Sequence, residues 1–161
     1  MYKAKAMDKI IDTQHFSDEI FNKLYPLLDR EFEVLKNTTD WQEHCDLSNL
    51  VEEWQREFYS LSYYEKKLVF PCLLDNISKN QLPGTGQNIE EIERLTSQKE
   101  KRILLLCERA ENLAMNCGLP EKHPIFGLVF LFQNSFCEVK GKWHAYLKEI
   151  SVHKVCPSGE K

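Results

Sequence analysis

The stretch Ser48–Asn80, SNLVEEWQREFYSLSYYEKKLVFPCLLDNISKN, decides the fold, because its apolar residues recur every three or four positions. That spacing places them on one face of a helix. The stripe consists of Leu47, Val51, Trp54, Phe58, Leu61, Leu68, Cys72 and Leu73. We therefore predict one long helix here, kinked near its far end where Pro71 removes a backbone donor.

Glu65 interrupts this apolar stripe. It falls between Leu61 and Leu68, where an apolar residue is due, so its carboxylate is aimed at the core. A buried carboxylate is costly unless it is paired, and burial raises its pKa. Glu65 is therefore the most informative residue of the chain, either as one half of a structural ion pair or as a functional group.

Three further helices are predicted around this one. The first begins near Thr13 or Ser17 and bends at Pro26, the third covers residues 88–117, and the fourth starts at Pro124. Their apolar stripes are Phe16, Ile20, Leu24, Leu27 or Leu28, Phe32 and Leu35; Ile89, Ile92, Leu95, Ile103, Leu106, Ala110, Leu113 and Cys117; and Phe126, Val129, Phe132, Phe136, Trp143, Leu147 and Ile150.

Short connections join these helices, and the clearest is the segment 81–88 with its proline and two glycines. Four long helices with short connections predict an all-α fold, an antiparallel up-down-up-down four-helix bundle. We expect residues 1–161 to form a single helical-bundle domain, with a core over about 14–157.

Charge and hydropathy narrow the choice of partner and compartment. A net charge of −4 with a pI near 5.8 favours neither nucleic acid nor an anionic membrane surface. The longest apolar run, residues 125–132, is too short to cross a bilayer, and the first 25 residues hold no apolar core of signal-peptide length. We expect a cytoplasmic protein whose six cysteines are reduced thiols, with a protein partner or self-association.

Local catalytic motifs are absent from the sequence. It has no GxxxxGK[ST], GxGxxG, HExxH, GxSxG or CxxC pattern, so no enzyme class built on these signatures is indicated. Glu65 is the one candidate for a general acid or base, because burial would raise its pKa. Buried carboxylates more often belong to structural ion pairs, and we expect no enzyme.

Two short motifs resemble a known family. The segment EKKLVFP, Glu65–Pro71, resembles the second helix of hemerythrin-like (HHE) bundles, in which a histidine four residues earlier completes an HxxxE iron-binding motif. Leu61 takes that histidine's place here. His144–Glu149 is similar to the HxxxxE/D motif of the family's fourth helix, and His15 lies where the first-helix histidine would be.

The resemblance implies a four-helix bundle that has lost the di-iron centre of the family. The family's third helix carries histidines, whereas this chain has Lys99 near that place and only His15 and His144 at matching histidine positions. The leading interpretation is a non-catalytic hemerythrin-like bundle that acts as a regulatory or partner-binding module without a cofactor.

The alternative interpretation keeps a metal. His15, Glu65, His144 and Glu149 would supply four nitrogen and oxygen donors, enough for one iron or zinc ion if they converge. Such a site would sense oxygen, nitric oxide or the metal itself.

A count along the predicted helices suggests a partner for Glu65. With turns centred near residues 42, 84 and 121, Glu65 and Lys99 differ in height by only ~6 Å along the bundle axis. The same count places His15 and His144 near that level, although residues in the middle of long helices align this way in any bundle. We therefore predict a core ion pair between Glu65 and Lys99.

Overall fold

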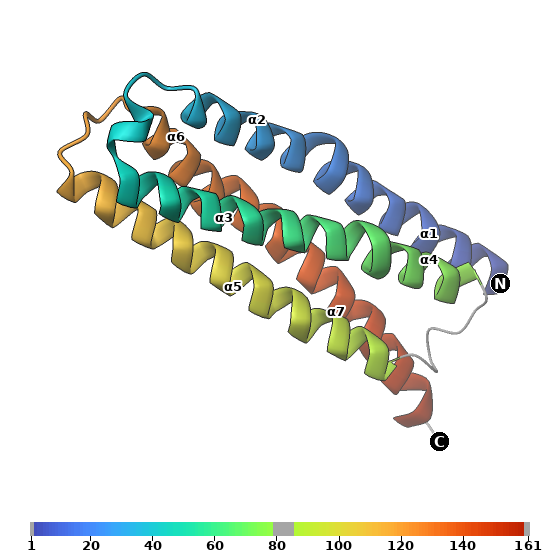
Figure 1. Ribbon diagram of the computed structural model, residues 1–161. Helices are drawn as coiled ribbons and strands as arrows, with labels where there is room; N and C mark the ends of the chain where they lie inside the picture. Colours follow the sequence, from blue (N-terminus) through green and yellow to red (C-terminus); the bar gives the residue numbers. More distant parts are fainter. Residues whose placement is uncertain (1, 79–85, 160–161) are drawn as a thin grey trace.

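The computed structural model describes residues 2–78 and 86–159, and the side chains of residues 7–78 and 89–150. Within these ranges the chain is all-helical, without strands, and forms four helical arms (Figure 1). The first arm is α1 (Tyr2–Asp18), η1 (Glu19–Leu24) and α2 (Tyr25–Lys36); the second is α3 (Cys45–Tyr64), η3 (Glu65–Val69) and α4 (Phe70–Ser78); the third is α5 (Gly86–Asn116); the fourth is α6 (Pro124–Leu131), η5 (Phe132–Phe136) and α7 (Cys137–Gly159). A 3₁₀ turn, η2 (Trp41–Glu43), connects the first two arms.

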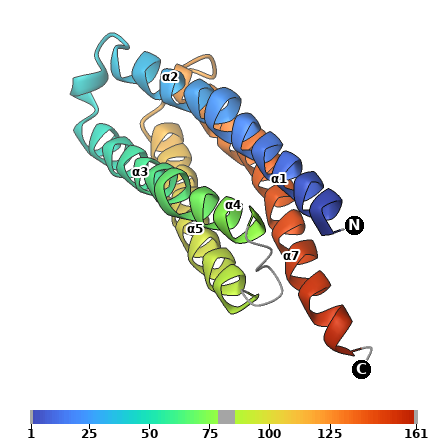
Figure 2. The ribbon, with the colours of Figure 1, turned by 90° about the vertical axis from the view of Figure 1, so that its right-hand side faces the viewer.

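The four arms lie side by side, with both chain termini at the same end (Figures 1 and 2). Near the opposite end, Phe32 of the first arm packs against Trp54 of the second and Phe132 of the fourth. Nearer the termini, Thr13 shares a hydrogen bond of 2.8 Å with Tyr146. Residue numbers therefore rise along the first arm as they fall along the fourth.

Part of the core is a cluster of aromatic rings that were all predicted on core stripes. The rings of Trp54 and Phe132 lie 4.9 Å apart, and Phe58 and Phe136 pack against Phe132 at 5.7 and 5.1 Å. Each of these side chains is at most 1% exposed. The apolar periodicity therefore located this part of the core correctly.

Three of the arms contain a π-helical segment, η1, η3 and η5. In η1 the Tyr25 N–H donates to the Ile20 carbonyl, one residue before Pro26. The same arrangement, with the Phe70 N–H donating to Glu65, directly precedes the proline of the second arm. Because proline has no N–H to donate, the wider turn lets each helix continue past it, and both arms run through their prolines without a break, as predicted.

The wider turn in η3 changes which residues face the core. Leu68, predicted on the stripe, is 58% exposed, whereas Val69 and Phe70 are buried. A π turn holds one more residue than an α turn, so the stripe after Glu65 is displaced by one position. In the first arm the sequence left open whether Leu27 or Leu28 faces the core, and Leu28 is the residue that is fully buried.

Some predicted helix ends differ from those observed. The first helix begins at Tyr2, well before Thr13, and Thr13 is a buried residue within α1. Most of the predicted connection 81–88 lies outside the described residues. None of the described helices is both long and apolar enough to span a bilayer.

Candidate functional site: a buried charged cluster

Glu65 lies in the core of the molecule, as its place in the apolar stripe predicted. It is the first residue of η3 and is 0% exposed. The Tyr25 hydroxyl, from the first arm, donates to Oε1 of Glu65. The Lys140 ammonium, from the fourth arm, donates to Oε2 and forms an ion pair with the carboxylate.

Lys140 joins all four arms. Its side chain is 2% exposed, and its Nζ contacts Glu65, lies 3.4 Å from Oε2 of Glu100 on α5, and donates to the Tyr25 hydroxyl at 3.3 Å. Each arm thus contributes one polar side chain to a single point in the core. One ammonium lies between two carboxylates there, so the pairing is electrostatic as well as hydrogen-bonded.

The polar contacts continue from the core toward the surface. Nε2 of His144, one turn after Lys140 on α7, lies 2.9 Å from each carboxylate oxygen of Glu100. Its Nδ1 lies 3.7 Å from Oε2 of Glu93, and the His144 and Glu93 side chains are 16% and 21% exposed. We refer to Tyr25, Glu65, Glu100, Lys140 and His144 as the buried charged cluster.

Burial changes the pKa values of two residues in this cluster, Glu65 and Tyr25. It raises the pKa of Glu65 above its ordinary value, although the Lys140 charge and the hydrogen bonds from Lys140 and Tyr25 act in the opposite direction. Burial, with the nearby Glu65 carboxylate, also raises the pKa of Tyr25 well above 10.0. Tyr25 therefore keeps its proton at neutral pH and acts as a hydrogen-bond donor to Glu65.

The predicted partner of Glu65 was wrong, because Lys99 lies elsewhere. Its Nζ donates to Ser60 at 3.3 Å and lies 5.5 Å from the centre of the Tyr64 ring. The buried face of α5 runs through Thr96, Glu100 and Ile103, so the polar residue directed into the core is the neighbour of Lys99. The prediction of a core ion pair at Glu65 was correct, but its cation is Lys140.

The four candidate metal ligands are not brought together. Glu65 and His144 belong to the buried charged cluster, but each has its own partners there. The His15 side chain is 69% exposed and lies 3.6 Å from Glu19, and Glu149 is an exposed residue of α7. Among the described residues, no group of three or more histidine, cysteine, aspartate or glutamate side chains is placed to hold a metal ion.

No family model, curated protein or solved structure matches this chain.

Sequence reasoning missed three members of the cluster, although a signal for two of them was present. Phe132, Phe136, Lys140 and Trp143 recur at helical spacing, so Lys140 interrupts the fourth stripe as Glu65 interrupts the second. Glu100 likewise precedes Ile103 on the buried face of α5. Tyr25 keeps helical spacing with the core residues Leu28 and Phe32, but a tyrosine at such a position is an ordinary core residue, so the pattern did not mark it as a polar partner of Glu65.

Proposed function

We propose that this chain is a non-catalytic, hemerythrin-like antiparallel four-helix bundle that acts as a regulatory or partner-binding module. In this proposal an internal ion pair replaces the metal centre of the family. The position of the Lys140 ammonium, between the Glu65 and Glu100 carboxylates, is the observation that carries it. An ammonium there supplies the positive charge that a bound cation would otherwise supply.

The contacts of the cluster do not fit a di-iron centre. Metal ligands must direct free electron pairs at one point, but Oε1 of Glu65 accepts from Tyr25 and Oε2 accepts from Lys140. His144 is directed at Glu100, whose other contact is with Lys140 at 3.4 Å. These contacts support a core that is complete without metal.

Burial of the cluster supports a non-catalytic role. Tyr25, Glu65 and Lys140 are 5%, 0% and 1% exposed, so their reactive atoms are enclosed by the four arms. A catalytic acid or base must come within hydrogen-bond reach of a substrate. Burial accounts for the raised pKa of Glu65, against the opposing effect of its ion pair with Lys140.

Exposed aromatic side chains support the partner-binding half of the proposal. Tyr63 of α3 and Phe130 of α6 are 67% and 62% exposed. Large aromatic side chains of this kind frequently carry the binding energy of protein interfaces. They give a partner an apolar anchor on the second and the fourth arm.

Metal content tests the absence of a metal centre. Protein purified without added metal, and protein dialysed after addition of iron(II) or zinc, should contain much less than one metal atom per chain by elemental mass spectrometry. Retention of one or more atoms per chain in the wild type, with their loss in His144→Ala, would contradict the proposal.

A double substitution separates a structural cluster from a chemically active one. Glu65→Gln with Lys140→Met removes the charges while keeping similar side-chain volumes, and it should leave the cellular interactions of the tagged protein unchanged. Truncating an anchor, by Tyr63→Ala or Phe130→Ala, should weaken them. Quantitative co-purification would measure both effects, and loss of the interactions in the folded double variant alone would show that the charges themselves perform the function.

A further inference from the structure

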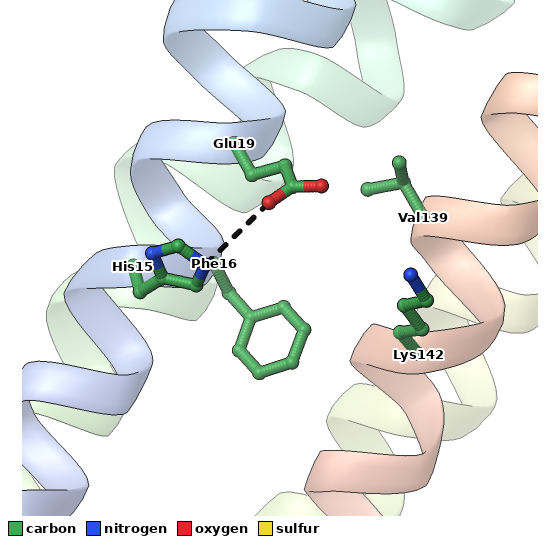
Figure 3. Close-up of a pocket in the computed structure, with 5 residues that line it drawn as sticks. All are labelled: His15, Phe16, Glu19, Val139 and Lys142. Carbon is green, nitrogen blue, oxygen red and sulfur yellow. Dashed lines mark ion pairs between the residues drawn. The ribbon is translucent and has the colours of Figure 1, made fainter.

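A surface groove separate from the buried charged cluster lies between the first and fourth arms (Figure 3). Its volume is about 150 Å³. His15, Phe16 and Glu19 line it from the first arm, and Val139 and Lys142 line it from α7. A cavity of this volume is large enough for a molecule about the size of benzene.

The two walls of the groove carry opposite charges. On one wall, Oε2 of Glu19 lies 3.6 Å from Nε2 of His15, and the Glu19 side chain is 38% exposed. On the other wall Lys142 extends its ammonium toward the same space (Figure 3). Within the described part of the chain Lys142 forms no ion pair, and the Glu19 carboxylate stays partly exposed beside His15, so a ligand between the walls can reach both groups.

The inner side of the groove is apolar and fixed. The Phe16 ring packs 5.4 Å from the Trp143 ring and 5.0 Å from the Tyr146 ring. Tyr146 is itself held by its hydrogen bond with Thr13. Phe16 therefore keeps its position, and together with Val139 it offers an apolar surface between the two charged walls.

We propose that this groove binds a small zwitterion, a free α-amino acid with a short aliphatic side chain. The ligand carboxylate pairs with Lys142, and the ligand ammonium pairs with Glu19. The aliphatic side chain lies against Phe16 and Val139. Each part of the ligand thus meets a group of matching chemistry.

This inference does not depend on the proposed function, because none of the five lining residues belongs to the buried charged cluster. It adds a ligand to the surface of the module. The groove residue Glu19 is also the first residue of η1, the π segment that ends at Leu24, one residue before the cluster residue Tyr25.

Titration with L-valine, followed by amide NMR shifts of the full-length protein, tests the proposal. We expect saturable shifts around Glu19 and Lys142 with a dissociation constant on the order of 1 mM, because the ligand is small and the groove is open. Isobutylamine lacks the carboxylate and 3-methylbutanoate lacks the ammonium. Each should bind at least about tenfold more weakly than valine.

Two variants locate the site. Glu19→Gln and Lys142→Met should each raise the dissociation constant for valine at least about tenfold, whereas Lys148→Met, an exposed control on the same helix, should not change it. Unchanged melting temperatures would show that the variants are folded. Equal binding of valine and 3-methylbutanoate, no saturable shift in the wild type, or unchanged binding in both groove variants would each overturn the proposal.

Discussion

Lys140→Met is the substitution that most directly tests the buried charged cluster. It keeps the length of the side chain but removes the ammonium, which is the cation in contact with Glu65. The Glu65 carboxylate would then be left in the core with the Tyr25 hydroxyl as its remaining hydrogen-bond donor. The expected result is a large loss in the free energy of unfolding.

The size of this loss follows from burial. Glu65 is 0% exposed and Lys140 is 1% exposed, so water cannot replace the missing partner. Removing one member of a buried ion pair typically costs about 3 to 5 kcal/mol. We expect a loss in that range, because Glu100 also loses its contact with the ammonium.

The loss should depend on pH in a defined direction. Burial raises the pKa of Glu65 above 4.5 even beside Lys140, so the folded state binds this proton more tightly than the unfolded chain. The stabilisation from this proton is complete below about pH 4.5 and disappears as pH rises through the raised pKa. Removing Lys140 raises the pKa further, and the deficit of Lys140→Met should therefore be larger at pH 8 than at pH 5.

Two control variants make the result decisive. Adding Glu65→Gln to Lys140→Met should recover most of the loss, because the Glu65 charge is then gone and Glu100 keeps His144 as a partner. Lys99→Met should cost about 1 kcal/mol or less, since Lys99 loses only a contact with Ser60 and one with the Tyr64 ring. Urea unfolding at both pH values measures these differences. Additive effects at Glu65 and Lys140, or a deficit that does not change with pH, would refute the reasoning.

Three further predictions concern the core and its titratable groups. Phe132→Ala should lower the free energy of unfolding by about 3 to 5 kcal/mol, because its ring is fully buried. Phe130→Ala, at a 62% exposed position, should lower it by about 0.5 kcal/mol or less. Similar unfolding midpoints for the two variants would contradict the core assignment. Burial raises the pKa of Tyr146 to about 12, so the free energy of unfolding should fall as pH rises from 10 to 12. In an ultraviolet titration, Tyr146→Phe should remove one tyrosine that ionises near pH 12. Burial also raises the pKa of the Cys107 thiol to about 12, so a thiol reagent should modify the exposed Cys45 before Cys107. Equal modification rates for the two cysteines would argue against the burial of Cys107.

The sequence predicted the helices and most of the core because apolar periodicity depends only on local geometry. Trp54, Phe58 and Phe132 were assigned to the core correctly, and Glu65 was identified by the same rule as a carboxylate directed inward. Applied to the fourth stripe, the rule would also have identified Lys140. The error at Lys99 arose because the apolar stripe of the third helix was read through Leu95, whereas the buried face there runs through Thr96 and Glu100.

Other features could not be predicted from periodicity at all. Leu68 was assigned to the core and is exposed, because η3 adds a residue to one turn. In the first arm η1 likewise adds a residue to one turn. A π turn changes the phase of every later residue in its helix, and one apolar stripe read alone does not reveal the change. The prolines that follow these two segments predicted a bend but not its form.

The buried charged cluster has a further consequence for how the four arms align. A buried ion pair is often no more stabilising than apolar side chains of similar volume, so stability alone does not explain Glu65 and Lys140. Sliding one arm by a single turn, ~5.4 Å, would separate its polar side chain from the others and leave a buried charge unpaired. An apolar core would penalise the same shift much less. We infer that the cluster fixes the register of the arms, and a single sharp set of amide NMR signals from the Glu65→Leu, Lys140→Leu double variant would argue against this inference.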